Sequence, residues 1–176
     1  MLAGPSELLV IADDSADPEM VAADLIAQAE HDIDALPCLV TTDPGLPDRV
    51  DRCLADQLER LPTAGVAREA LANNGWACVV GTLDEAIAVS DRIAPEHLEL
   101  AVAEPEALFG RVNHAGAVFL GRHTPEAVGD YVAGPNHVLP TGRRARFASG
   151  LSVLDFMKRT SFIDANPQAL AAIGPA

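Results

Sequence analysis

Glu7-Leu8-Leu9-Val10-Ile11-Ala12 is the stretch that decides the fold of this chain of 176 residues. This apolar run lies between the turn residues Gly4-Pro5-Ser6 and Asp13-Asp14, which is typical of a strand buried on both faces of a parallel sheet. Asp17 and Pro18 follow as the expected N-cap and first residue of a helix. The order of strand, turn and helix predicts the first half of a βαβ unit.

The same alternation continues along the chain. Further apolar runs predict strands at 38–41, 76–80, 98–102 and 117–120. Helical patterns separate these runs, at 48–61, 66–73, 84–93 and 104–109. Because right-handed crossovers join parallel strands, the sequence predicts an α/β fold with a mostly parallel sheet flanked by helices.

The pattern changes after the last predicted strand. Residues 121–150 are rich in glycine and proline, and a loop of this length within a domain is usually functional. Residues 151–159 return to a helical pattern, and an Ala-rich tail follows. We therefore expect an α/β domain over residues 1–163 and a short helical stub over residues 164–176.

Charge and composition exclude several classes of partner. The chain has 12 Lys and Arg against 26 Asp and Glu, a net charge of -14, so its surface repels nucleic acids and anionic lipids. No apolar run approaches the length of about 20 residues that a membrane helix needs, and the start of the chain does not resemble a secretory signal. Cys38, Cys53 and Cys78 form no CxxC pair, which excludes a disulfide framework. We expect a cytoplasmic protein with reduced thiols, and neither a nucleic-acid nor a membrane partner.

The usual nucleotide-binding motifs are absent from the sequence. Neither GxGxxG nor GxxxxGK[ST] occurs, and these glycine-rich loops hold phosphates in many α/β enzymes. The turn after the first strand, residues 12–17, is acidic and would repel a pyrophosphate. We therefore expect that this turn does not bind a dinucleotide in the usual way.

Gln28 and His31 stand three positions apart near the end of the first predicted helix, so they share a helix face. Gln28 also falls on the apolar stripe of Val21 and Leu25, where a polar side chain needs a partner. A metal site is one interpretation. The other is structural: a histidine favoured by the helix C-terminus and a core amide bonded to the backbone. The spacing alone favours the structural interpretation.

Ala94-Pro95-Glu96-His97 is a second candidate site. Pro95 predicts the start of a helical turn, with Glu96 and His97 at its electropositive N-terminus. A carboxylate beside an imidazole offers two bases of different pKa, which suits proton abstraction or activation of water. An exposed glutamate beside a capping histidine is the alternative, and the pair by itself favours neither.

The third candidate lies between Gly129 and His137. The glycines and proline of this stretch can turn Asp130 and His137 inward, and an aspartate with two histidines is acceptable zinc chemistry. The alternative is a set of Asx turns with His137 exposed. His114 and His123 have no such context, and we expect them at the surface.

These stretches resemble successive motifs of the histidinol dehydrogenase family. The matching segments, in order, are Gly4-Pro5-Ser6-Glu7, Gln28-Ala29-Glu30-His31, and residues 92–99, 129–141 and 149–153. The resemblance covers nearly the whole chain, and the segments 92–99 and 129–141 are individually specific. It implies a zinc-dependent, NAD-linked homodimeric enzyme of histidine biosynthesis, which oxidises L-histidinol to L-histidine in two steps through a bound aldehyde.

The resemblance also implies a catalytic pair. His97 is expected to take protons in the alcohol oxidation, and Glu96 to activate the water that attacks the aldehyde. Ser6 and His137 are expected to contact the substrate, together with His97. The residues that bind NAD stay unknown, because most NAD contacts of the family lie in its first half, which this chain lacks.

The zinc ligands implied by the resemblance are Gln28, His31 and Asp130, which would also border the substrate. In the family a further histidine ligand and a glutamate that contacts substrate come across the dimer from a C-terminal segment. This chain stops before that segment. We therefore expect three protein ligands here, and zinc that is held more weakly and is more open to water.

By this resemblance the chain is the C-terminal catalytic half of a larger enzyme, with an incomplete Rossmann-like domain. Its partner would be a second copy of the chain or the missing N-terminal half. We expect the isolated chain to be inactive, because hydride transfer needs the absent half. The alternative is a non-enzymatic relic of the family that binds zinc or imidazole compounds.

Overall fold

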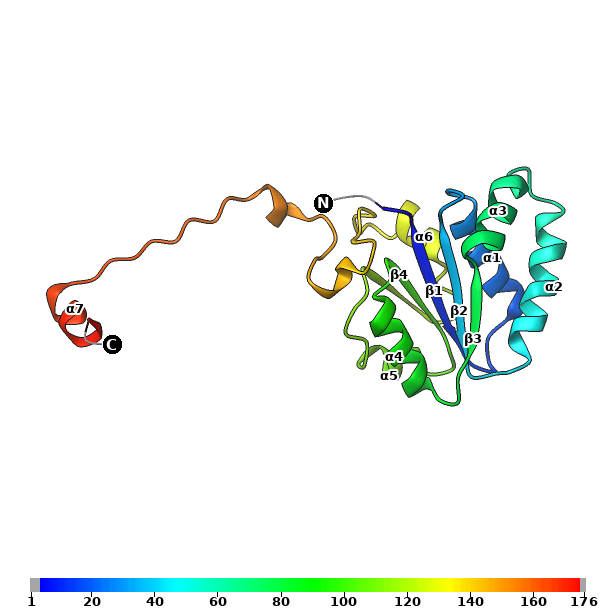
Figure 1. Ribbon diagram of the computed structural model, residues 1–176, viewed down its shortest axis with the longest axis horizontal. Helices are drawn as coiled ribbons and strands as arrows, with labels where there is room; N and C mark the ends of the chain where they lie inside the picture. The colour runs from blue at the N-terminus through cyan, green and yellow to red at the C-terminus, as the bar shows by residue number, and fades with distance from the viewer. Residues whose placement is uncertain (1–3, 175–176) are drawn as a thin grey trace.

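The strands form one parallel sheet in residues 4–174, the part of the chain that the computed structural model describes. The sheet has the order β3-β2-β1-β4-β5 (Figure 1). The strands are β1 (Glu7–Ala12), β2 (Leu36–Thr41), β3 (Trp76–Val79), β4 (His97–Ala101) and β5 (Ala117–Leu120). The predicted α/β fold with its parallel sheet is confirmed.

The first strand, β1, lies at the centre of the sheet. Its residues from Leu8 to Ala12 are all buried, as the apolar run predicts. Leu9 stands opposite Cys38 of β2 on one side and opposite Leu98 of β4 on the other. Strands β2 and β3 extend the sheet in one direction, and the chain then returns to place β4 on the other side of β1. This makes the boundary between β1 and β4 a topological switch point.

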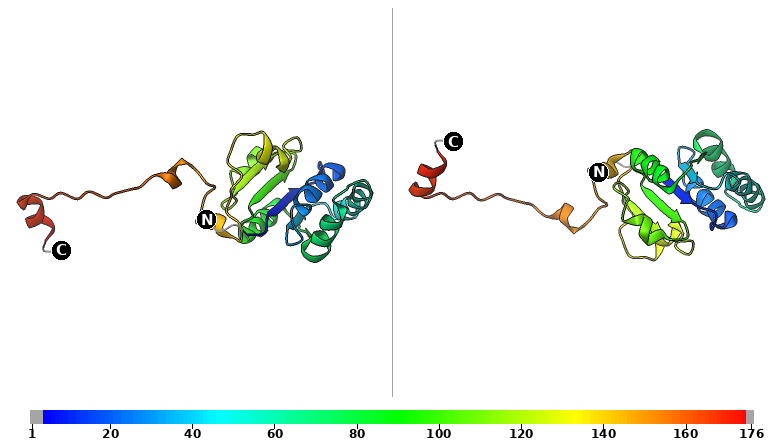
Figure 2. Two further views of the ribbon diagram at one scale, coloured as in Figure 1. Left: turned by 90° about the horizontal axis from the view of Figure 1, so that it is seen from above. Right: turned by 90° about the horizontal axis from the view of Figure 1, so that it is seen from below.

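Helices cover both faces of the sheet (Figure 2), and the alternating side chains of β1 divide the core between them. Leu8 and Val10 pack with α1 and α2, whereas Leu9 and Ile11 lie in the cluster of α4 and α5. The helices of these two layers are α1 (Pro18–Ala29), α2 (Leu46–Leu58), α3 (Ala64–Asn74), α4 (Leu83–Ile93) and α5 (Pro105–Phe109). The two layers bury the central strands β1, β2 and β4, whereas β3 at one side of the sheet stays largely exposed.

Local signals explain helix α1, which ends beside two of the predicted site residues. The side chain of Asp17 accepts a hydrogen bond from the backbone N–H of Glu19, and Pro18 occupies the first turn, as the sequence predicts. The helix ends at Ala29, so His31 lies just beyond its last turn.

Residues 94–97 do not form the helical turn that Pro95 predicts. Ala94 ends α4 in the left-handed conformation, with φ of 52°, and His97 is the first residue of β4. His97 pairs with Leu8 on one side and with Ala117 on the other. Pairing on both sides outweighs the local preference of Pro95 for a helix start, so the prediction is wrong here.

The long segment 121–150 is less irregular than the sequence predicts. It contains the short helix α6 (Glu126–Tyr131), which lies against α1, and a 3-10 helix, η1 (Arg144–Arg146). Pro125 is the N-cap residue of α6. The remaining stretch from Val132 to Arg143 leads back to the edge of the sheet where β1 begins.

The helix predicted over residues 151–159 is also wrong. Only a 3-10 turn forms there, η2 (Val153–Phe156), and an extended chain then leads to α7 (Pro167–Ile173) (Figures 1 and 2). Every residue from 152 to 174 is exposed. Short helices are marginal in water without a packing partner, so the helical pattern alone does not produce a helix here. The stub over 164–176 includes α7, and its last two residues lie outside the described part.

Two further properties concern the lengths of the helices and the state of the cysteines. Within residues 4–174, none of the helices has both the length and the apolar character that crossing a bilayer requires. Cys38, Cys53 and Cys78 are free thiols. Burial raises the pKa of the Cys38 thiol, so this side chain is an apolar part of the core.

Candidate active site

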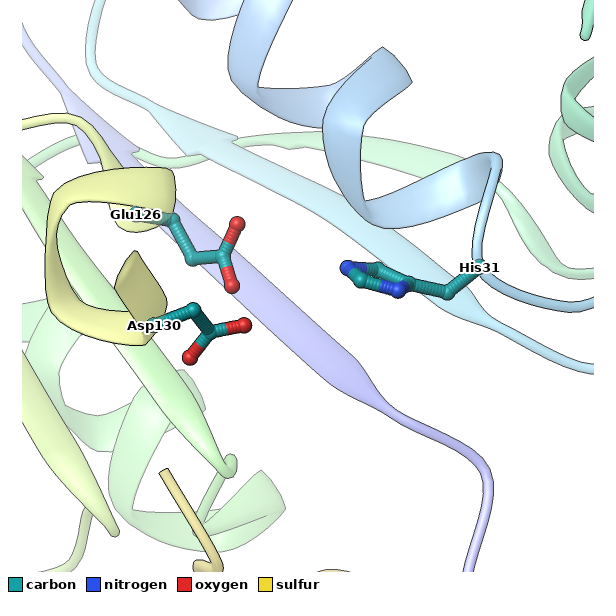
Figure 3. Close-up of side chains that lie close together, drawn as sticks. All are labelled: His31, Glu126 and Asp130. Atoms are coloured by element: carbon teal, nitrogen blue, oxygen red, sulfur yellow. The ribbon is translucent and has the colours of Figure 1, made fainter. Parts of the chain in front are cut away.

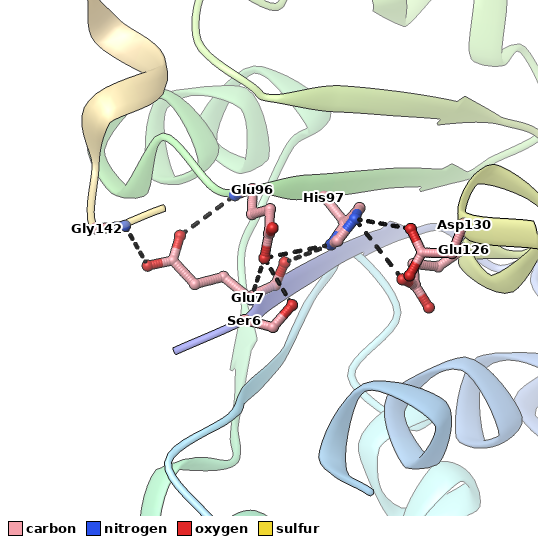
Figure 4. A network of polar contacts seen from close by, with 7 residues as sticks. All are labelled: Ser6, Glu7, Glu96, His97, Glu126, Asp130 and Gly142. Atoms are coloured by element: carbon pink, nitrogen blue, oxygen red, sulfur yellow. Dashed lines mark hydrogen bonds and ion pairs between the residues drawn. The ribbon is translucent and has the colours of Figure 1, made fainter. Parts of the chain in front are cut away.

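The titratable side chains singled out by the sequence gather at the edge of the sheet where β1 and β4 begin (Figure 4). Open α/β sheets usually bind ligands at the opposite edge, beyond the carboxyl ends of the strands. Helix α1 ends at this edge, so the negative end of its dipole faces the site. Such an edge favours a cation and disfavours a phosphate group.

Glu96 is held by the segment that begins β1. The Ser6 hydroxyl donates a hydrogen bond of 2.6 Å to Oε2 of Glu96, and the backbone N–H of Glu7 donates to the same oxygen at 3.1 Å. Glu96 is buried, with 7% of its surface exposed. Its carboxylate therefore has a defined position beside His97, whose Nδ1 lies 3.7 Å from Oε2.

His97 has two ring nitrogens in different surroundings. Nδ1 lies 3.2 Å from the backbone carbonyl oxygen of Glu7, and a carbonyl only accepts, so Nδ1 carries a proton. Nε2 lies 3.7 Å from Oε1 of Glu126 and 3.8 Å from Oδ1 of Asp130. Nε2 is thus the nitrogen that faces the acidic side of the site.

Burial is the main cause that shifts the pKa values of His97 and Glu126. Desolvation lowers the pKa of His97, while the nearby carboxylates of Glu96 and Asp130 act in the opposite direction. Burial, together with the charge of Asp130, raises the pKa of Glu126 to about 7. Near neutral pH, a neutral His97 can therefore face a Glu126 that holds a proton. This combination can pass a proton in either direction.

His31, Glu126 and Asp130 point toward one another (Figure 3), and one ligand atom from each lies within 4.8 Å of the others. Glu126 and Asp130 are four residues apart on α6, which places both on one helix face. Glu126 is 1% exposed, and its Oε1 has no hydrogen-bond partner among the described residues. The cluster has the donor atoms that a divalent cation requires.

The surroundings of Gln28 also favour the interpretation of this region as a metal site. It is fully buried, and in the described part of the chain neither its amide nitrogen nor its amide oxygen has a hydrogen-bond partner. The structural alternative, a core amide bonded to the backbone, is therefore wrong. An unpartnered buried amide costs about 1–3 kcal/mol, which a ligand would offset. The imidazole of His31 and the carboxylate of Asp130 are usual zinc ligands, whereas an amide such as that of Gln28 is a rare one.

A cavity of about 170 Å³ opens beside His97. Asp130 and His137 line it on the side of segment 121–150, and Phe119 and Gly129 form part of an otherwise mainly apolar wall. The ring centres of Phe119 and His97 are 5.9 Å apart. The cavity thus offers a mainly apolar space next to an imidazole and a carboxylate.

The turn between β1 and α1 does not fit a dinucleotide. Asp13 uses its carboxylate to accept hydrogen bonds from the backbone of Ser15 and of Ala103. No glycine lies in this turn, and Asp14 and Asp17 add negative charge. The turn is built from internal hydrogen bonds among acidic residues, and the described residues suggest no NAD site there.

The structure brings most of the predicted site residues together. Glu96, His97, His31 and Asp130 converge at the start of the sheet, and His137 reaches the cavity although it is exposed. Ser6 contacts Glu96 and is not among the residues that line the cavity. His114 and His123 take no part in the described contacts of the site.

Sequence reasoning missed Glu7 and Glu126. Glu126 follows Pro125 and stands four positions before Asp130, which is the spacing of one helix face, so a helix prediction at this point could have found it. Glu7 offers no comparable signal. Its carboxylate accepts hydrogen bonds from the backbone N–H groups of Glu96 and Gly142, which are distant in the sequence.

Comparison with known proteins gives a consistent result. The profile of a family described as histidinol dehydrogenase matches residues 1–176. The histidinol dehydrogenase of Zymomonas mobilis is 57% identical over 176 residues, which are 100% of this chain and 41% of that protein. The histidinol dehydrogenase of Rhodospirillum rubrum is 56% identical, over 99% of this chain and 41% of its own length.

The fold has a close counterpart in a solved structure. The crystal structure of histidinol dehydrogenase from Elizabethkingia anophelis superimposes with a TM-score of 0.91 and 42% identity. The match covers 99% of this chain and 40% of that one. The chain therefore spans about two fifths of the length of these relatives, and its position as their C-terminal half stays a prediction.

Proposed function

The chain belongs to the histidinol dehydrogenase family, and we propose that it supplies the catalytic edge of an enzyme that oxidises L-histidinol to L-histidine. The observation that carries this proposal is the convergence of Glu96 and His97 with the cluster of His31, Glu126 and Asp130 at one edge of the sheet. Two bases and a set of cation ligands meet there, beside a cavity of about 170 Å³.

Zinc would be held by Gln28, His31 and Asp130, the ligands that the family motifs suggest. Bound zinc would orient the amino alcohol and polarise its reacting oxygen. The unpartnered amide of Gln28 and the convergence of His31 and Asp130 support this assignment. A fourth protein ligand is not assigned.

His97 and Glu96 would divide the proton transfers between them. Nε2 of His97 has a free lone pair when Nδ1 donates to the Glu7 carbonyl, so Nε2 accepts the hydroxyl proton during oxidation of the alcohol. Glu96 activates the water that adds to the aldehyde. Ser6 and the Glu7 backbone hold its Oε2 in place, which orients the carboxylate for this second step.

The cavity is proposed as the place of the substrate imidazole. Phe119 offers an aromatic wall, and His137 and Asp130 offer polar contacts at its rim. Its volume of about 170 Å³ suits a small ring compound and excludes a dinucleotide. We assign no NAD-binding residue and derive no step through NAD.

The proposal extends to the assembly. The enzyme would be a cytoplasmic homodimer, and a second copy or an N-terminal half would supply the remaining NAD and zinc contacts. The isolated chain is expected to form no NADH from histidinol and NAD with zinc present. NADH formation by the isolated chain would contradict that expectation.

A chimera tests the function directly. In it, this chain replaces the matching 176 residues of the Zymomonas mobilis relative, to which it is 57% identical. We expect histidinol-dependent NADH formation by the chimera and a loss of kcat of at least about 100-fold in His97→Asn. An inactive chimera that folds and binds zinc would overturn the proposal.

The second candidate is a non-enzymatic module that binds zinc or imidazole compounds, and the cluster of His31, Glu126 and Asp130 would serve it equally well. Calorimetry of zinc and histidinol binding separates the two. Binding by the chain that is lost in Asp130→Ala, together with an inactive chimera, would support the non-enzymatic module. Binding in neither protein would exclude it.

A further inference from the structure

Glu7 and Glu96 are joined by a reciprocal pair of hydrogen bonds (Figure 4). The backbone N–H of Glu7 donates to Oε2 of Glu96 at 3.1 Å, and the backbone N–H of Glu96 donates to Oε2 of Glu7 at 3.2 Å. Each carboxylate thus accepts from the backbone of the other residue. The pair connects the start of β1 with the segment that enters β4.

The second oxygen of Glu7 reaches a different part of the chain. Oε1 accepts a hydrogen bond of 2.9 Å from the backbone N–H of Gly142. Gly142 has φ of +61° and Arg143 has φ of 66°, so the chain makes a left-handed turn that glycine tolerates best. This turn ends the segment that carries His137 from the cavity back to the sheet.

The backbone of Glu7 completes the arrangement. Its carbonyl oxygen is the partner of Nδ1 of His97 at 3.2 Å. One residue therefore contacts both members of the catalytic pair and the turn behind His137. Glu7 does not reach the cavity and is not part of the cation cluster, so it acts through other residues.

We propose that Glu7 is a positioning residue whose carboxylate fastens the Glu96 backbone and the Gly142 turn to β1, and so aligns the bases with the cavity. This inference rests on the proposed function for its catalytic consequence. The hydrogen bonds from the Glu96 and Gly142 backbones to the Glu7 carboxylate do not depend on the reaction. A displacement of about 1 Å in such a site lowers turnover by up to about 100-fold.

The variants are Glu7→Gln and Glu7→Ala, with Glu69→Gln as the matched control on the exposed side of α3. The glutamine side chain keeps one accepting oxygen and turns an NH₂ group toward the other N–H. The alanine side chain accepts nothing. Both leave the backbone bonds of residue 7 in place, so the sheet is expected to form in each variant.

The first measurement is amide hydrogen exchange in the chain itself. In Glu7→Ala we expect exchange at Glu96 and Gly142 to rise at least about tenfold, with amides of the distant strand β3 unchanged. Glu69→Gln is expected to match the wild type. Unchanged exchange at both amides would overturn the proposal, whatever the reaction of the enzyme.

The second measurement is steady-state kinetics in the chimera. We expect kcat to fall in the order wild type, Glu7→Gln, Glu7→Ala, by about 10- to 100-fold overall, with KM for histidinol within about threefold. Zinc affinity is expected to stay unchanged. Formate is expected to restore part of kcat in Glu7→Ala, while chloride at the same ionic strength does not.

The two measurements keep the two proposals distinguishable. An inactive wild-type chimera overturns the proposed function, and amide exchange then still decides whether Glu7 fastens the two segments. An active chimera with unchanged kcat in Glu7→Ala overturns the positioning role. A fall in kcat without formate rescue, accompanied by weaker zinc binding, would show general structural damage and also contradict the proposal.

Discussion

Two carboxyl groups near His97 are buried more deeply than Glu96. Glu99 lies two residues after His97 on β4 and is 2% exposed, and Asp24 of α1 is 5% exposed. Burial raises the pKa of Glu99 to about 9, and it also raises the pKa of Asp24. Glu99 therefore holds a proton at neutral pH, and this neutral acid of β4 lies beside Asp24 of α1.

The variant Glu99→Gln tests whether the Glu99 side chain is protonated in the folded protein. The folded pKa of about 9 lies above the ordinary value of 4.5, so the free energy of unfolding of the wild type falls as pH rises between these two values. Glutamine mimics the neutral acid at every pH. We expect Glu99→Gln to be more stable than the wild type at pH 8 by at least about 1.4 kcal/mol, the equivalent of one pKa unit.

Urea unfolding of both proteins at pH 5 and pH 8 measures the effect. The difference between variant and wild type is expected to be small at pH 5, where both side chains are neutral. A variant that is less stable than the wild type by the same amount at both pH values would contradict the assignment of the proton.

Gly129 is required by the packing of the cavity wall. A Cβ atom at this position would lie 2.6 Å and 2.7 Å from two ring atoms of Phe119, whose ring packs beside His97. We expect Gly129→Ala to lower the free energy of unfolding by about 1–3 kcal/mol and to weaken histidinol binding. Gly65→Ala is the control, because a Cβ there meets no atom within 4 Å. Equal stability of the two variants would refute this reason for Gly129.

At the scale of single residues, the sequence predicted the site where neighbours in the chain carry the signal. Glu96 and His97 are adjacent, and Gln28 and His31 are three apart. Glu7 could not be found in this way, because its carboxylate contacts residues 89 and 135 positions away. No local pattern reports a contact of that span.

At the scale of elements, α1 holds one side of the site in place. It begins at the Asp17 cap and ends just before His31, so its position along the sheet decides where Gln28 and His31 lie. Helix α6 brings Asp130 and Glu126 to the same place from the other direction. The site thus depends on the relative position of two helices that face each other.

The Asp17→Ala variant tests the start of α1. The Asp17 side chain accepts from the backbone N–H of Glu19 at 2.9 Å, and loss of such a cap costs about 1 kcal/mol. We expect this decrease in the free energy of unfolding by chemical denaturation. Asp14→Ala, an exposed change in the same turn, is expected to leave it unchanged. A cost shared by both variants would indicate a charge effect in place of capping.

Elements were predicted well where burial and local pattern agree. β1 and β5 have the predicted bounds, Glu7–Ala12 and Ala117–Leu120, and the other three strands deviate by one or two residues at an end. The pattern failed at Pro95, where strand pairing overrides a local helix signal, and over residues 151–159, where a helical pattern has nothing to pack against. Both failures concern tertiary contacts that periodicity does not contain.

At the scale of the whole molecule, the last segment differs from the rest. All residues from 152 to 174 are exposed, among them Phe156 at 80% and Phe162 at 90%. Apolar surface of this extent promotes self-association. The exposed segment thus contributes apolar surface and little to the folded sheet.

Removal of this segment is therefore expected to be harmless to the fold. A chain that ends at Leu151 is expected to unfold with the same free energy within about 1 kcal/mol, as measured in urea. Sedimentation velocity is expected to show association of the 176-residue chain and less association of the shortened one. A loss of several kcal/mol would mean that the segment packs on the sheet in solution.

The candidate site at the strand starts lies away from the turns at the opposite edge of the sheet. Turns at that edge, such as the exposed Gly81 between β3 and α4, lie about a strand length from His97, on the order of 15 Å. A fluorescent label or surface anchor attached there is therefore expected to report on the protein, or immobilise it, without touching the side chains around His97.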